Sequence, residues 1–161
     1  MKESDADHGP GMLETDAVLV RELKASDLEA IARIDEKIFG RSRRKYFEVK
    51  IASALRDTGV KISLVSEIDG VVAGFVMGSV YYGEFGLPEP AATIDTIGVH
   101  PDFRGRKVAR ALMRQLTMHL TALGIETIET QVEWNDWDLL RFLDHEGFVP
   151  APRLCLRRRL A

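Results

Sequence analysis

One stretch of the sequence, residues 94–113, holds the residue types that could bind a phosphate. An apolar run typical of a strand ends at Val99, and a short turn then leads into a long amphipathic helical pattern. The first turn of a helix has unpaired N–H groups and a partial positive charge, and the small residues Gly105 and Ala109 would let a phosphate approach the backbone. Four cations surround this helix start: Arg104, Arg106, Lys107 and Arg110. Cations oppose the dipole at a helix N-terminus, so they indicate a bound anion such as a pyrophosphate more than a solvated basic turn.

The elements that position this stretch follow from hydrophobic periodicity and turn residues. Strands are predicted at 17–23, 60–68, 71–82, 92–99, 125–133 and 148–160, and helices at about 27–39, 42–56, 104–123 and 136–146. Ser26 and Glu29 are expected to form a capping box, and Asp69-Gly70 predicts a two-residue hairpin turn. Lys107 falls in the first turn of its predicted helix, so we expect a negative φ there. A hairpin meander followed by a strand–helix–strand crossover predicts a mixed α/β sheet.

Composition and charge limit the remaining classes. The chain has 161 residues, of which 45% are hydrophobic and 29% charged, which is typical of one globular domain. Residues 1–16 are polar and acidic, contain Gly9-Pro10-Gly11, and are expected to be a disordered leader before a single domain at 17–161. The formal net charge is −3, and the part after the leader is nearly neutral. We therefore expect no nucleic-acid partner, because such binders carry a strong basic excess.

Metal, disulfide and membrane chemistry also find no support in the sequence. Cys155 is the single cysteine, and the four histidines lack the spacing of a metal site. No uncharged apolar run is long enough to span a membrane, and the first residues do not resemble a signal peptide. We expect no metal, no membrane partner and a cytoplasmic location.

The segment Val99–Leu112 resembles the acyl-CoA signature of the GNAT superfamily of N-acetyltransferases, whose core is Arg/Gln-x-x-Gly-x-Gly/Ala. Arg104 matches its first position and Ala109 its last, whereas Lys107 stands where the middle glycine is usual. Downstream, Asp136–Phe148 resembles the second motif of the family, with Asn135 as the candidate for its usual asparagine. The order of predicted elements fits as well, so the resemblance covers about residues 17–160.

The resemblance implies a fold and a co-substrate. The fold would be a GNAT fold, a mixed and mostly antiparallel sheet of six to seven strands flanked by four helices, splayed between the fourth and fifth strands. Acetyl-CoA would place its pantetheine in that gap, against the free backbone edge of the fourth strand, and its pyrophosphate on the turn before the helix. The implied CoA-binding residues are Ile97, Gly98, Val99, Arg104, Gly105, Arg106, Lys107, Val108, Ala109, Arg110 and Asn135.

The resemblance also directs attention to candidate catalytic residues. The amine that attacks the thioester must be neutral, which calls for a base. Asp95 is the best candidate, and strand alternation predicts that it shares a face with Ile97 and Val99. The tyrosine that usually protonates the leaving thiolate falls at Leu143, which cannot donate a proton. Tyr81 or Tyr82 could substitute, and so could solvent.

Two functions of different classes remain open at this stage. The first is an N-acetyltransferase that acts on a primary amine of a small molecule or a peptide, either as a monomer or as a homodimer. The second is a CoA-binding regulatory or interaction domain that has lost catalysis, which Lys107 and Leu143 would favour. The identity of the amine cannot be read from these residues.

Overall fold

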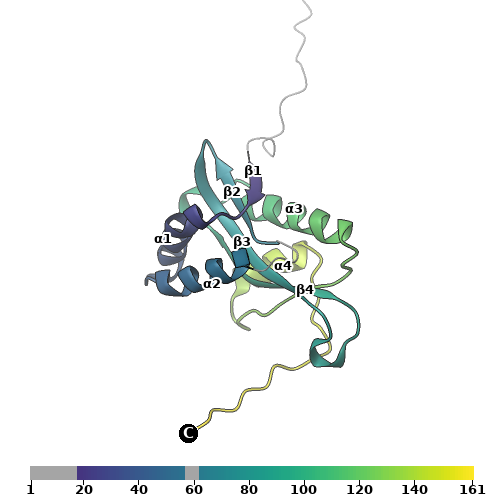
Figure 1. Ribbon diagram of the computed structural model, residues 1–161. Helices are drawn as coiled ribbons and strands as arrows, with labels where there is room; N and C mark the ends of the chain where they lie inside the picture. Colours follow the sequence, from purple (N-terminus) through teal and green to yellow (C-terminus); the bar gives the residue numbers. More distant parts are fainter. Residues whose placement is uncertain (1–17, 57–61) are drawn as a thin grey trace, which may run out of the picture. The chain divides into compact units, whose positions relative to one another are not determined.

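The computed structural model describes residues 18–56 and 62–161 of the chain (Figure 1). The predicted leader at 1–16 and the first residues of the predicted strand 60–68 lie outside the described residues. The chain divides into two units, one that ends at Gln131 and one that spans Val132–Ala161. Each unit is described by itself.

The first unit contains most of the predicted elements. In chain order they are β1 (Leu19–Glu22), α1 (Leu28–Phe39), α2 (Arg44–Arg56), β2 (Leu64–Ile68), β3 (Val71–Tyr81), β4 (Ala91–Val99), α3 (Val108–Ala122) and β5 (Ile128–Thr130). Three short 3-10 turns lie between them: η2 (Ala25–Asp27), η3 (Glu84–Gly86) and η4 (Pro101–Phe103). The second unit contains α4 (Trp137–His145). None of the helices in the described part of the chain is long and apolar enough to cross a membrane.

The sheet of the first unit has the strand order β1-β2-β3-β4-β5. Strands β1 to β4 pair antiparallel, and β5 pairs parallel to β4 after the α3 crossover. Asp69 and Gly70 join β2 to β3 with φ values of 51° and 76°, as a hairpin turn with two positive φ angles requires. The mixed sheet, the four helices and this turn confirm the predicted fold class.

The core lies between the sheet and two different helical layers. On one face, Ile31 and Ile34 of α1 and Phe47 of α2 pack with Phe75 and Met77 of β3 in a buried cluster. On the other face α3 covers the sheet, and its inward residues are buried: Val108, Leu112, Met113, Leu116 and Leu120. Both apolar stripes follow the 3.6-residue period that predicted these helices.

The sheet has fewer strands than expected, because one predicted strand is absent. Residues 148–160 form neither helix nor strand, and all of them except the half-buried Phe148 are exposed, although apolar residues and arginines are interspersed there. Alternation marks a segment that could be a strand, but a strand forms only where a neighbour pairs with its backbone. The prediction of six to seven strands was therefore wrong, since the described residues form five. Strand β5 is also shorter than the predicted 125–133.

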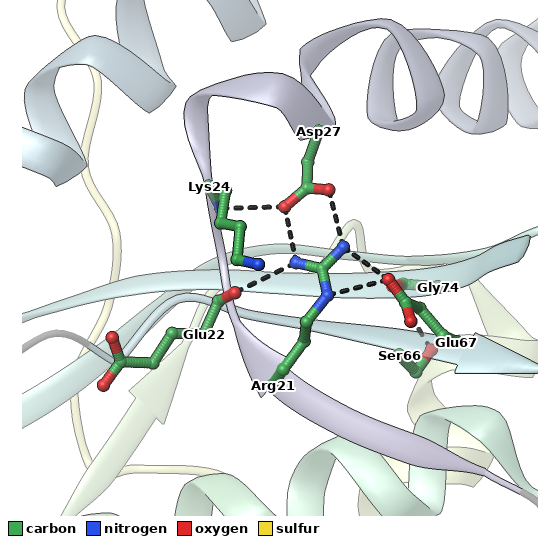
Figure 2. Close-up of polar contacts among 7 residues, drawn as sticks. All are labelled: Arg21, Glu22, Lys24, Asp27, Ser66, Glu67 and Gly74. Carbon is green, nitrogen blue, oxygen red and sulfur yellow. Dashed lines mark hydrogen bonds and ion pairs between the residues drawn. The ribbon is translucent and has the colours of Figure 1, made fainter. Parts of the chain in front are cut away.

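The end of β1 is tied to η2 and β2 by one arginine, as Figure 2 shows. The Arg21 guanidinium donates two hydrogen bonds of 2.8 Å to the Asp27 carboxylate and one of 2.8 Å to Glu67. Asp27 also accepts from the backbone N–H of Lys24 at 2.8 Å, which gives the η2 turn its cap. The predicted capping box of Ser26 and Glu29 was wrong, because Asp27 takes this part.

The ion pair of Asp27 makes stability sensitive to acid. Burial alone would raise the pKa of Asp27, but the hydrogen bonds and charges of Arg21 and Lys24 outweigh it and hold this pKa below its usual range. A carboxyl group whose pKa is lower in the folded state stabilises the fold. This stabilisation is complete at a pH above the unfolded-state pKa of about 3.9, and it is lost as the pH falls through the folded-state pKa.

We expect Asp27→Asn to lower the free energy of unfolding by about 2 kcal/mol or more near neutral pH, because Arg21 loses the more buried of its two charged partners. The difference in the free energy of unfolding between the wild type and Asp27→Asn should become smaller below about pH 4. Denaturant unfolding across a pH series measures both effects, with the exposed Asp69→Asn as the control. A difference in the free energy of unfolding that stays constant down to the lowest pH of the series would contradict this account.

Candidate active site

The start of α3 leaves the first backbone N–H groups of the helix without intrahelical partners. After η4, Arg104 is extended, Gly105 has a φ of 76° and Lys107 has a φ of 62°, and α3 then begins at Val108. No side chain caps this end of α3, and its first turn contains no acidic residue. The helix therefore starts four residues later than predicted, and its dipole is left without a protein anion.

The backbone conformation of Lys107 differs from the one expected from the sequence. We expected a negative φ, but Lys107 adopts the left-handed conformation at the N-cap of α3. Non-glycine residues pay about 1–2 kcal/mol for this conformation, which gives a physical reason for a glycine at the position. The Lys107 side chain is exposed and does not occupy the space inside the turn. Lysine in place of the usual glycine therefore strains the backbone but leaves the turn open.

We expect Lys107→Gly to raise the free energy of unfolding by about 0.5–1 kcal/mol, because relief of the left-handed strain exceeds the entropy cost of glycine. Its effect on CoA affinity should stay below tenfold, or about 1.4 kcal/mol. Chemical denaturation and calorimetric titration with CoA give the two values. CoA binding by the variant alone, with none by the wild type, would show that Lys107 has disabled the site.

A close approach of backbone to helix holds the N-terminus of α3 on the sheet. An added Cβ at Gly74 of β3 would lie 2.7 Å from Cγ1 of Val108, which is the first residue of α3 and is buried. The absence of a side chain at Gly74 thus lets Val108 pack against the strand. The cations Arg104, Arg106 and Lys107 lie exposed around this anchored end. This arrangement can hold a phosphate group.

Strand β4 has an edge that β5 leaves uncovered. The two strands pair only from Ala92 to Ile94, whereas β4 pairs with β3 as far as Val99. Within the first unit, the backbone of residues 95–99 therefore has one side without a strand partner. An extended ligand with amide groups could pair with this edge, as in β-strand addition.

Asp95 lies where this free edge begins, in a β-bulge. Met77 of β3 pairs with Thr96 and the next residue, Gly78, pairs with Ile94, so that Asp95 is the extra residue of β4. Its Oδ2 accepts a hydrogen bond of 2.5 Å from Nζ of Lys50 on α2. The carboxylate thus faces the layer of α1 and α2.

The bulge overturns the predicted face of Asp95. Gly98 pairs with Phe75, and a Cβ at Gly98 would lie 2.8 Å from that ring, so Gly98 also faces α1 and α2. Ile97 and Val99 alternate with Gly98 and face α3 instead. The prediction that Asp95 shares a face with them was wrong, because strict alternation does not hold across a bulge.

Asp95 belongs to a pocket of about 170 Å³ on the α1–α2 face of the sheet. Charged side chains in its lining are Glu22, Lys50 and Asp95. The apolar lining comes from Leu23, Ala54, Leu55, Ile62 and Met77, and the remaining lining residues are Gly78 and three serines: Ser53, Ser63 and Ser79. A pocket with an apolar floor and few charges is typical of a small-molecule site.

Sequence reasoning missed Lys50 and Glu22. Lys50 lies 45 residues before Asp95, on a different element, and nothing in its own helical pattern reports that contact. Glu22 ends β1, and nothing in the pattern of that strand reports its place in the lining of the pocket. Only the tertiary arrangement brings both residues to Asp95.

The other predicted catalytic and binding residues lie outside this pocket. The Tyr81 hydroxyl donates a hydrogen bond of 2.6 Å to Glu129 of β5, and Tyr82 is exposed. In the second unit, Asn135 directly precedes Asp136, which caps α4 through a hydrogen bond from the N–H of Leu139. Leu143 is buried on α4. The described residues contain no cluster of three or more His, Cys, Asp or Glu side chains suited to a metal ion.

Comparison with known proteins identifies the family. The family model described as "Acetyltransferase (GNAT) family" matches residues 28–148, most of the chain. A crystal structure of Ard1 from Thermoplasma volcanium is similar with 25% identity and a TM-score of 0.70, over 83% of each chain.

Two further solved structures share the fold. The aminoglycoside N-acetyltransferase AAC(6')-Iy, in complex with CoA, has 19% identity and a TM-score of 0.74, over 89% of this chain and 95% of that one. The ribosomal-protein-alanine N-acetyltransferase from Brucella melitensis biovar Abortus 2308 has 23% identity and a TM-score of 0.70, over 90% and 100%. With the family match running from α1 through the turn before α3 to the end of α4, the chain belongs to the GNAT family of acetyltransferases.

Proposed function

We propose that the protein is an N-acetyltransferase that moves an acetyl group from acetyl-CoA to a primary amine of a small molecule or a protein N-terminus. Attack is direct and passes through a tetrahedral intermediate. One observation carries the proposal: β4 loses its pairing with β5 after Ile94, and the next residue, Asp95, turns its carboxylate into a pocket. A thioester on the free edge and an amine in the pocket would meet at this point.

The residues of the first unit fit the chemistry of CoA. The backbone of Ile97, Gly98 and Val99 lies on the free edge, where it can pair with the amides of pantetheine. A backbone N–H there would also stabilise the oxyanion of the intermediate. Further proposed contacts to the phosphates come from the start of α3: Arg104, Gly105, Arg106, Lys107, Val108, Ala109 and Arg110.

Asp95 is proposed to take the proton of the attacking amine. Lys50 occupies Oδ2, and Oδ1 has no hydrogen-bond partner among the described residues, so it can accept that proton directly or through a water. Lys50 holds the carboxylate in place and adds a positive charge beside the amine, which disfavours protonation of the amine.

The leaving thiolate needs a proton from a group other than Leu143. Tyr81 and Tyr82 remain the proposed side-chain donors, and solvent is the alternative. The Tyr81 hydroxyl donates a hydrogen bond to Glu129, so a role as acid would require Tyr81 to exchange this partner.

A thiol-release assay with acetyl-CoA and a panel of primary amines tests the proposed function. The expected result is thiol release that depends on both the amine and the enzyme. Acetyl-CoA binding without release on any amine would instead favour a CoA-binding domain that has lost catalysis. This alternative function is favoured by Lys107, which replaces the usual glycine of the family and has a strained backbone.

A further inference from the structure

The pocket carries one more acidic than basic side chain. Among its described lining residues, Glu22 and Asp95 are acidic and Lys50 is basic. Lys50 is already held by Asp95. The Glu22 carboxylate has no hydrogen-bond or ion-pair partner among the residues that the structure describes, and Figure 2 shows it pointing away from the Arg21 network. One negative charge of the pocket is therefore left uncompensated.

The lining between the charged groups includes an apolar floor. Ala54 and Leu55 of α2 are the partly exposed apolar residues of this lining, and Leu23, Ile62 and Met77 lie beneath it with exposed fractions of 5% or less. A polar chain would lose water contacts on such a surface, whereas methylene groups would gain from burial there. The lining thus suits a ligand with an aliphatic stem and a positive charge.

We propose that the acceptor is a straight-chain aliphatic diamine, with its distal ammonium paired to Glu22 and its reacting amine beside Asp95. The proposal rests on the proposed acetyltransferase function. In its reactive form a diamine has one neutral amine and one ammonium, and that single charge neutralises the net charge of the described lining. The methylene spacer would lie over Ala54 and Leu55.

The chemistry of the transfer balances without another reactant. The neutral amine forms a bond to the thioester carbonyl carbon, and the carbon–sulfur bond breaks. The CoA thiolate leaves with the electron pair, and the proton lost by the amine nitrogen passes to Asp95 and then to solvent. The distal ammonium keeps its proton and its contact with Glu22 throughout.

The anchoring role of Glu22 predicts a change in KM more than in kcat. Glu22 would hold the end of the diamine that does not react, so its loss weakens binding and leaves the reacting amine in place. Because Glu22 is exposed, its ion pair is screened by solvent, and the expected effect is about fivefold. Added salt should reduce this effect further.

The test measures steady-state rates on straight-chain diamines from propane to hexane and on the monoamines of equal carbon count. We expect the wild type to prefer the diamine of each pair by about fivefold or more in kcat/KM. Glu22→Gln should raise KM for diamines and remove the preference, with monoamine rates unchanged. Glu36→Gln, an exposed change on α1 outside the pocket, is the matched control and should keep the preference.

The outcomes separate the two proposals. Equal rates on monoamines and diamines, or a preference that survives Glu22→Gln, would overturn the diamine assignment and leave the acetyltransferase function standing. Acetyl-CoA binding with no turnover of any amine would overturn the acetyltransferase function and the diamine assignment with it.

Discussion

Replacing Asp95 by asparagine is expected to lower kcat/KM for the amine by about 10²–10⁴-fold, the usual contribution of a general base. Asparagine keeps the shape of the side chain and can still accept a hydrogen bond from Lys50, but it cannot take a proton from the amine. Acetyl-CoA affinity should change little, because the proposed CoA contacts lie on the β4 edge and at α3. Steady-state kinetics and calorimetric titration measure the two quantities.

A second variant separates the base from its ion pair. Lys50→Met removes the cation and leaves the Asp95 carboxylate, so it should cost less than tenfold in kcat/KM. Near-normal turnover by Asp95→Asn across the pH range would remove Asp95 from the mechanism.

The second large effect is expected from Gly78→Ala, which should lower the free energy of unfolding by at least about 2 kcal/mol. An added Cβ at Gly78 would lie 2.2 Å from the carbonyl oxygen of Thr93, and that atom belongs to the backbone of β4 and cannot move alone. Gly78 is opposite the bulge that presents Asp95. The Gly78→Ala protein that does fold should therefore also be less active than the wild type.

Gly86→Ala is the matched control for this loss of stability. Gly86 has a φ of 71°, and a Cβ there would meet nothing within 4 Å. Alanine at this position should cost only the strain of a left-handed backbone, about 1–2 kcal/mol, with activity unchanged. Equal stability of Gly78→Ala and the wild type in denaturant unfolding would show that the bulge tolerates a side chain.

Local patterns predicted most of the fold because they reflect local physics. The apolar stripes of α1 and α3 and the Asp69-Gly70 turn each depend on neighbours within a few residues, and each prediction was confirmed. The strand predicted at 148–160 failed because a strand depends on a partner that its own alternation does not specify. The start of α3 failed because a lysine at positive φ breaks the usual backbone preference.

The site was predictable only in part for the same reason. Family resemblance and the helix dipole pointed to Asp95 and to the turn at Gly105, which the fold places at the free edge of β4 and before α3. The bulge that sets the direction of Asp95 is a property of the β3–β4 register, which no pattern within β4 shows. Lys50 and Glu22 reach the pocket from elements that the sequence does not place side by side.

The most direct test of the central claim is the mass of the product. Wild-type protein is incubated with acetyl-CoA labelled with ¹³C in the acetyl group and a straight-chain diamine, and the amine is analysed by mass spectrometry. The account predicts an amine that carries one labelled acetyl group, formed in proportion to the free thiol and strongly reduced with Asp95→Asn. Free thiol with labelled acetate and no acetylated amine, or acetyl-CoA bound and unchanged, would contradict it.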